Sequence, residues 1–96
     1  MHIDKEAWRQ LLDLIGACDS PKQLSDVFEL LFTIEEREQL ADRVIIMREL
    51  FRGKLTQREL AKQFDISIAK ITRGSNCLKG ANQKLCDFIE SHLVKD

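Results

Sequence analysis

The chain has 96 residues, of which 44% are hydrophobic and 32% are charged, and its net charge is −1. A chain this short forms one domain and buries only about two-thirds or less of the surface that its unfolded form exposes, so further apolar surface must find a partner. With one proline and four glycines, the composition favours long helices and excludes a disordered or fibrous chain.

The first half of the chain predicts two helices before any longer element. Apolar residues recur over about residues 4–17 at the i, i+3, i+4 spacing of a helix stripe. Ser20 can then cap a second helix, because its hydroxyl accepts from an unpartnered backbone amide and Pro21 occupies the first helical position. We expect this second helix to end near Phe32.

A third helix is the longest predicted element. Thr33 and Glu36 have the spacing of a capping box, in which each side chain accepts from a backbone amide of the first turn. The helix then continues for about five turns to Phe51. Gly53 offers the positive φ angle that commonly ends a helix.

The second and third helices carry more apolar surface than one small subunit can cover. A helix that is apolar nearly all round must be buried nearly all round. We therefore expect a second copy of the chain to pack against these helices; a monomeric bundle with some exposed apolar surface is the alternative. The apolar residues are Leu24, Val27, Phe28, Leu30, Leu31 and Phe32 in the second helix, and Val44, Ile45, Ile46 and Met47 in the third.

Two short helices follow, joined by a tight turn. Thr56 and Glu59 repeat the capping-box spacing and open a helix that stops near Asp65. After the turn, Ser67 caps a helix that runs to about Lys79. Two short helices joined in this way are typical of a DNA-binding helix-turn-helix motif.

Small and apolar residues stand where this motif needs them. Ala61 is small where the two helices must approach closely, Ile66 fills the turn, and Ile71 seats the second helix, while Leu60 and Phe64 face inward. Asp65 replaces the glycine often found in the turn, and aspartate tolerates a left-handed backbone better than most residues.

Positive charge is concentrated on the same segment. Residues 52–84 contain eight basic and two acidic residues, a net charge of +6, whereas residues 1–51 have a net charge of −5 and residues 85–96 one of −2. Such a segment attracts phosphate while the whole chain stays nearly neutral. A solvated basic face without a partner is the alternative.

The second helix of the motif enters the major groove with its amino-terminal residues at the base edges. Methyl groups can contact thymine, and lysine or threonine can contact a base or a phosphate. The candidate base-contacting residues are Ile68, Ala69, Lys70 and Thr72, and Gln57 and Arg58 at the start of the first helix are candidates for backbone contacts.

The segment ITRGSNCLK, preceded by LTQREL, resembles the Trp repressor family of tryptophan-responsive bacterial regulators, and the resemblance runs from about Leu30 to Lys79. It implies an all-α chain of six helices that forms an intertwined homodimer with a helix-turn-helix reading head. Within a single domain over 1–96, residues 1–52 would form the dimerisation core, residues 56–79 the helix-turn-helix, and residues 81–94 a C-terminal core helix.

The resemblance also implies L-tryptophan as a small-molecule corepressor. By position in the family motifs, Arg43 and Arg73 would lie on the two faces of the indole, and Arg73 would reach the ligand carboxylate. The same positions imply that Thr33 contacts the carboxylate, that the carbonyls of Leu30 and Phe32 receive the ammonium, and that Gly74 leaves room for the ring. Cys77 stands where many members have a serine that helps to hold the ammonium.

The sequence therefore predicts a repressor that binds palindromic operator DNA as a dimer when tryptophan is bound. A related regulator without a tryptophan response is the first alternative, and a helical protein-interaction module is the second. No spacing supports an enzyme or a metal site, and we expect the three cysteines to be free thiols. No segment approaches the roughly 18 apolar residues that cross a bilayer, so we expect a cytoplasmic protein without a membrane partner.

Overall fold

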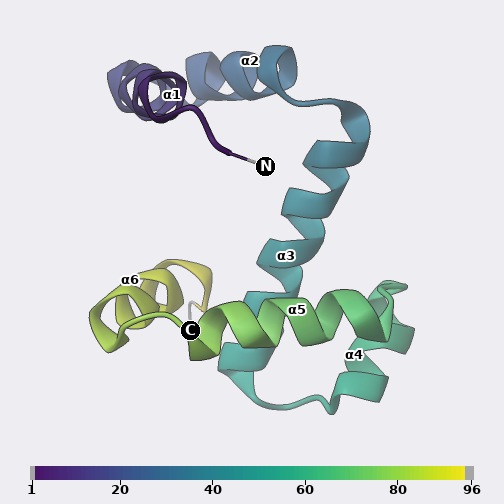
Figure 1. Ribbon diagram of the computed structural model, residues 1–96. Helices are drawn as coiled ribbons and strands as arrows, with labels where there is room; N and C mark the ends of the chain where they lie inside the picture. The colour runs from purple at the N-terminus through teal and green to yellow at the C-terminus, as the bar shows by residue number, and fades with distance from the viewer. Residues whose placement is uncertain (1, 95–96) are drawn as a thin grey trace. The chain divides into compact units, whose positions relative to one another are not determined.

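The computed structural model describes residues 2–94, which form six α-helices and no strand (Figure 1). The all-α, six-helix prediction is confirmed, with helix ends within one or two residues of those expected. None of the helices in the described part is long and apolar enough to span a membrane. The helices are α1 (Lys5–Ala17), α2 (Pro21–Leu31), α3 (Ile34–Arg52), α4 (Gln57–Phe64), α5 (Ile68–Lys79) and α6 (Gln83–Leu93).

The helix ends are set by local side-chain chemistry. The Ser20 hydroxyl accepts from a backbone amide of α2 at 3.1 Å, and the Ser67 hydroxyl does the same in α5 at 3.2 Å. At the start of α3, the Glu36 amide donates to the Thr33 hydroxyl at 3.1 Å, and the Thr33 amide donates to the Glu36 carboxylate at 2.8 Å. Gly53 follows α3 with φ of +67°. These predicted caps are therefore confirmed.

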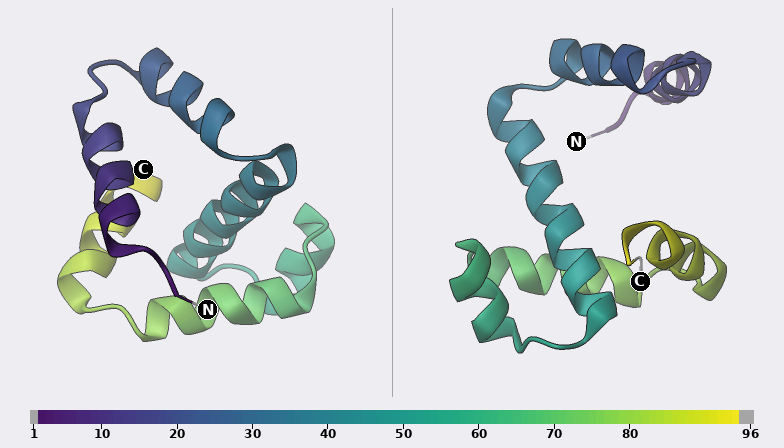
Figure 2. Two further views of the ribbon diagram at one scale, coloured as in Figure 1. Left: turned by 45° about the horizontal axis from the view of Figure 1, so that its top comes forward. Right: turned by 180° about the vertical axis from the view of Figure 1, so that it is seen from behind.

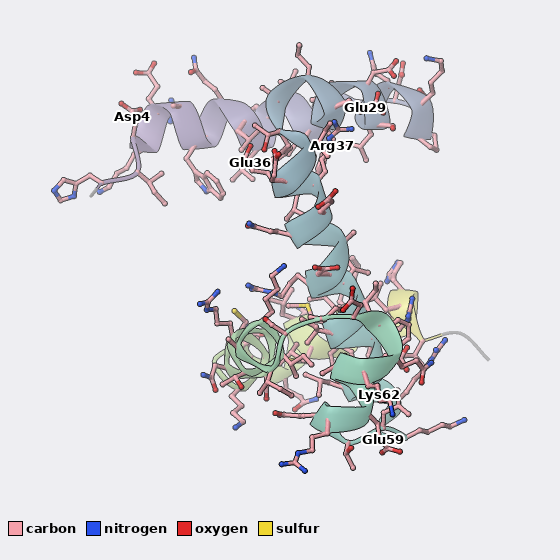
Figure 3. All side chains as sticks on the ribbon, turned by 90° about the vertical axis from the view of Figure 1, so that its right-hand side faces the viewer. Asp4, Glu29, Glu36, Arg37, Glu59 and Lys62 are labelled. Atoms are coloured by element: carbon pink, nitrogen blue, oxygen red, sulfur yellow. The ribbon has the colours of Figure 1, made fainter. Side chains whose placement is uncertain are left out.

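The chain divides into an N-terminal unit (Met1–Arg37) and a C-terminal unit (Glu38–Asp96), and α3 has residues in both. The N-terminal unit contains α1, α2 and the first turn of α3. The Arg37 guanidinium lies 3.6 Å from the Glu29 carboxylate of α2 (Figure 3). Neither α1 nor α2 has a buried residue, although both are amphipathic.

The buried core described within residues 2–94 lies in the C-terminal unit and consists of Ile46, Leu60, Ile66 and Ile71. In this unit α5 lies across the C-terminal half of α3, and α4 packs on α5 (Figures 1 and 2). Leu60, Ile66 and Ile71 are among the residues that the sequence placed inside the motif, while Phe64 is half-buried against the same core. The reading head and the end of α3 therefore share one core.

A charged cluster fixes the C-terminal end of α3. The Glu49 side chain is buried, and its carboxylate accepts from the Arg48 guanidinium at 2.7 Å and from the Arg52 guanidinium at 3.0 Å. The Arg48 guanidinium also lies over the ring of Phe64 of α4, 5.6 Å from its centroid. The end of α3 is thereby connected to the end of α4.

The predicted capping box at the start of α4 forms in full. The Thr56 amide donates to the Glu59 carboxylate at 2.9 Å, and the Glu59 amide donates to the Thr56 hydroxyl at 3.1 Å. The hydrogen bond from the Thr56 backbone, followed by that with its side chain, lowers the pKa of Glu59 below the ordinary value of 4.5. Figure 3 shows Glu59 and Lys62 projecting from α4.

This lowered pKa predicts a pH-dependent contribution of Glu59 to stability. Because the folded state favours the carboxylate, the contribution is present above pH about 4.5 and is lost as the pH falls through the lower pKa of the folded state. We expect Glu59→Ala to lower the urea midpoint of unfolding at pH 7. At pH 3 the midpoints of Glu59→Ala and the wild type should differ less. Glu38→Ala, which removes an exposed acid of α3, should give a difference that does not shrink in this way.

Candidate DNA-binding surface and ligand pocket

The turn between α4 and α5 has the geometry that a helix-turn-helix requires. Asp65 adopts the left-handed conformation, with φ of 54° and ψ of 49°. The Ile66 amide donates to the Ala61 carbonyl at 3.1 Å, and the Ile66 side chain is buried in the turn. Aspartate therefore fulfils the role that glycine often has in this turn.

The residues predicted to contact bases lie at the start of α5. Ile68 is 46% exposed and Ala69 is also exposed, so both offer methyl groups to a partner. Thr72 is exposed, and its hydroxyl donates to the Ile68 carbonyl at 3.0 Å, which leaves its methyl group and oxygen lone pairs available. Lys70 is half-buried rather than fully exposed. The structure thus places three of the four side chains on an open surface.

Gln57 and Arg58, predicted to contact the DNA backbone, begin α4 and are exposed. Two further basic residues of the helix-turn-helix are exposed: Lys62 on α4 and Lys79 at the end of α5. Phosphate contacts need exposed cations and amide groups rather than deep pockets. The surface of the motif can therefore neutralise phosphates as well as contact base edges.

An open pocket lies between α3 and α5 within the C-terminal unit. It is lined by Arg43 and Arg73, which the sequence predicted, and by Gln39, Asp42, Ile46 and Lys70. The α3 residues 39, 42, 43 and 46 recur at i, i+3, i+4 and i+7, which is one face of a helix. Gln39 and Asp42 were not predicted as site residues, and Ile46 was predicted only as apolar surface of this helix. Extending the helical spacing around Arg43 would have indicated all three.

Gly74 allows α3 and α5 to approach closely beside this pocket. A Cβ atom on Gly74 would lie only 2.7 Å from Cγ2 of Ile46 and 3.5 Å from Cδ of Arg43. One turn further along α5, the Arg43 guanidinium donates to the Cys77 sulfur at 3.2 Å. Arg43, Arg73, Gly74 and Cys77 are therefore brought together on α3 and α5, and their contact with a ligand stays a prediction.

Leu30, Phe32 and Thr33 belong to the N-terminal unit. Leu30 is 85% exposed, Phe32 is half-buried, and Thr33 caps α3. The carbonyls of Leu30 and Phe32 lie at the C-terminal end of α2, where the last carbonyls of a helix have no amide partner within it. They are chemically suited to accept from an ammonium group, and their predicted contact with a ligand stays a prediction.

Most of the chain is similar to one family of known proteins. The sequence signature of the family described as Trp repressor protein matches residues 6–93. The Trp operon repressor homolog of Chlamydia trachomatis serovar L2 is 39% identical over 90 residues, which are 94% of this chain and 96% of the relative. The Trp operon repressor homolog of Vibrio vulnificus strain YJ016 is 44% identical over 72 residues, 75% of this chain and 71% of the relative.

Proposed function

The chain belongs to the Trp repressor family of transcriptional repressors, and on that premise we propose that it binds palindromic operator DNA as a homodimer with L-tryptophan as corepressor. The observation that carries this proposal is the position of Arg43 and Arg73. Both line one pocket beside α5, the helix whose first turn is predicted to contact bases. A ligand in this pocket lies next to the reading helix.

The pocket has the chemistry to hold an aromatic amino acid. Guanidinium groups stack on aromatic faces and bind carboxylates, so Arg43 and Arg73 can bind both ends of such a ligand. Gly74 has no side chain of its own, so the side chains of Ile46 and Arg43 can lie close to α5 beside the pocket. In the proposed complex, its lack of a side chain leaves room for the ring. In the proposed complex, Thr33 contacts the ligand carboxylate, and the carbonyls of Leu30 and Phe32 accept from the ammonium, with Cys77 close to it.

The apolar surface of the chain supports the dimer. Helices α1 and α2 are amphipathic but have no buried residue, so their apolar faces are open to a partner. The first three helices, residues 1–52, together with the last helix form the proposed dimerisation core. Its large apolar side chains that remain exposed in a single chain are Ile3, Trp8, Leu12, Leu14, Leu24, Leu30, Leu31, Ile34, Leu40, Val44, Leu85 and Phe88.

The proposed response is a shift between two populations of the dimer. Tryptophan favours the orientation in which both α5 helices match successive major grooves of one duplex. Successive major grooves on one side of a DNA duplex lie about 34 to 36 Å apart. Dimers with paired helix-turn-helix motifs, among them Trp repressor, match this spacing. Because the coupling is reciprocal, operator DNA must raise tryptophan affinity by the same factor as tryptophan raises DNA affinity.

The experiment that tests this function compares the wild type with Arg73→Ala. A duplex is first selected by the wild-type protein from a random library with tryptophan present. We expect tryptophan to raise wild-type affinity for this duplex by about 5- to 150-fold, the usual range of such coupling. Arg73→Ala should lose this increase and show no heat on titration with tryptophan, because the stacking and carboxylate contacts are gone.

Lys79→Ala is the matched control, since it removes one positive charge from the other end of α5 and should keep the tryptophan response. Sedimentation of the wild type should show a dimer. A wild type that binds DNA equally with and without tryptophan would favour the regulator that lacks this corepressor. Binding to duplex DNA without any salt dependence would favour the protein-interaction module, because phosphate neutralisation releases counterions.

A further inference from the structure

An ion pair connects the predicted reading helix to α3 at the wall of the pocket. The Lys70 ammonium lies 3.3 Å from the Asp42 carboxylate, and the two side chains are 43% and 29% exposed. Lys70 is the third residue of α5, in the turn that a helix-turn-helix inserts into the major groove. The ammonium that the sequence assigned to a base or a phosphate therefore already has an anionic partner.

Stability does not account for this pair. An ion pair that remains partly exposed contributes little to folding, because water and salt screen it. The close approach of α3 and α5 is already secured by apolar contacts, since Gly74 abuts Ile46 and the buried Ile71 belongs to the same core. The chemical effect of Asp42 is to neutralise Lys70 and to hold its ammonium beside α3.

The charges around the pair make Asp42 distinctive. Of the residues that line the pocket, Arg43, Lys70 and Arg73 are basic, and Asp42 is the acid among them. Without its carboxylate, three cations would face one another across a small open space. A phosphate that approaches the first turn of α5 must compete with Asp42 for Lys70, and the carboxylate itself repels that phosphate.

We infer that Asp42 is a positioning residue that limits how strongly Lys70 binds DNA phosphate, and so raises the preference for operator over other DNA. Sequence-independent affinity comes chiefly from phosphate neutralisation, whereas base contacts supply the discrimination. Restraining Lys70 reduces this sequence-independent affinity. It leaves the methyl groups of Ile68 and Ala69 free to contact bases. This inference rests on the proposed DNA binding.

The test measures DNA affinity against salt for the wild type and for Asp42→Asn, with tryptophan present. The asparagine has nearly the same shape and no charge, so Lys70 is released. We expect the slope of log affinity against log salt to steepen by about 0.9, which is the release expected for one phosphate contact. That slope corresponds to an additional loss of about 3.5-fold between 50 and 200 mM salt. Affinity for random duplex should rise more than affinity for the selected duplex.

Two further variants make the test specific. Glu38→Gln removes the same charge one turn earlier on α3 and should leave the slope unchanged. In a Lys70→Gln background, Asp42→Asn should no longer steepen the slope, because the lysine that it releases is absent. Thermal unfolding of each variant checks that its fold is kept.

The outcomes separate this inference from the function on which it rests. If the wild type binds duplex DNA with a salt-dependent affinity, and Asp42→Asn has the same slope of log affinity against log salt, the inference is overturned and the proposed DNA binding stands. The inference is also overturned if Asp42→Asn still steepens the salt slope in the Lys70→Gln background. The same holds if Glu38→Gln steepens the slope as much as Asp42→Asn does. A wild type without salt-dependent binding would overturn the proposed DNA binding and the inference with it.

Discussion

Replacing Gly74 by alanine is expected to lower the free energy of unfolding by about 1–3 kcal/mol and to remove the tryptophan response. The added Cβ would lie 2.7 Å from Cγ2 of Ile46, a distance that real Cβ atoms do not adopt. Ile46 is 1% exposed and packed into the core, so it cannot rotate away. The helices α3 and α5 must therefore separate, which moves Arg43 away from Arg73. Urea unfolding followed by circular dichroism, at one fixed protein concentration, measures the loss.

Gly80→Ala is the matched control for this prediction. Gly80 has φ of −85°, which any residue adopts, and a Cβ atom there would meet its nearest atoms at 3.7 and 3.8 Å, an ordinary contact. We expect Gly80→Ala to be neutral or slightly stabilising, because alanine restricts the unfolded chain. Equal losses for the two variants would mean that the close approach at Gly74 does not hold α3 against α5. The double variant Gly74→Ala with Ile46→Ala should lose less unfolding free energy than the sum of the losses of the two single variants, because Ile46→Ala removes the clashing atom.

The helix starts were predictable because their causes are local. Thr33 with Glu36, and Thr56 with Glu59, satisfy amides only three residues away, so residue type and spacing contain the whole interaction. The last helix was expected to start at residue 81, two residues before its observed start at Gln83, although the cause of this start is equally local. The Asn82 side chain accepts from an amide of the first turn of α6 at 2.8 Å, and its position directly after Gly80 and Ala81 would have indicated that cap.

The charged contacts between helices could not be predicted in the same way. Asp42 and Lys70 are 28 residues apart, and Arg43 and Cys77 are 34 apart. Each contact depends on where α5 crosses α3, and that crossing is decided by the small size of Gly74 rather than by any charge. Arg43, Arg73 and Gly74 could be named from the sequence because the family resemblance implies a ligand contact at their positions. Asp42 lies directly before Arg43, but the resemblance implies no contact at its position.

Leu60→Ala is expected to cost about 2–5 kcal/mol of unfolding free energy, the range for a large-to-small change in a core. Leu60 has no exposed surface, and it packs with Ile46, Ile66 and Ile71 in a core of few side chains. A core of this size has little capacity to collapse around the missing atoms. Because small domains have only about 5–15 kcal/mol of stability in total, this one change should bring the C-terminal unit close to unfolding.

Hydrogen exchange locates this effect along the chain, since it reports local opening. Amides of α4 and α5 should lose most of their protection in Leu60→Ala, together with those of the C-terminal half of α3, which shares the core. Leu60→Met keeps nearly the same volume and should cost less than about 1.5 kcal/mol, with protection largely retained. If the alanine and methionine variants were equally stable, the joint core of α3, α4 and α5 would not be what positions α5, and the reading surface and the pocket would need a different support.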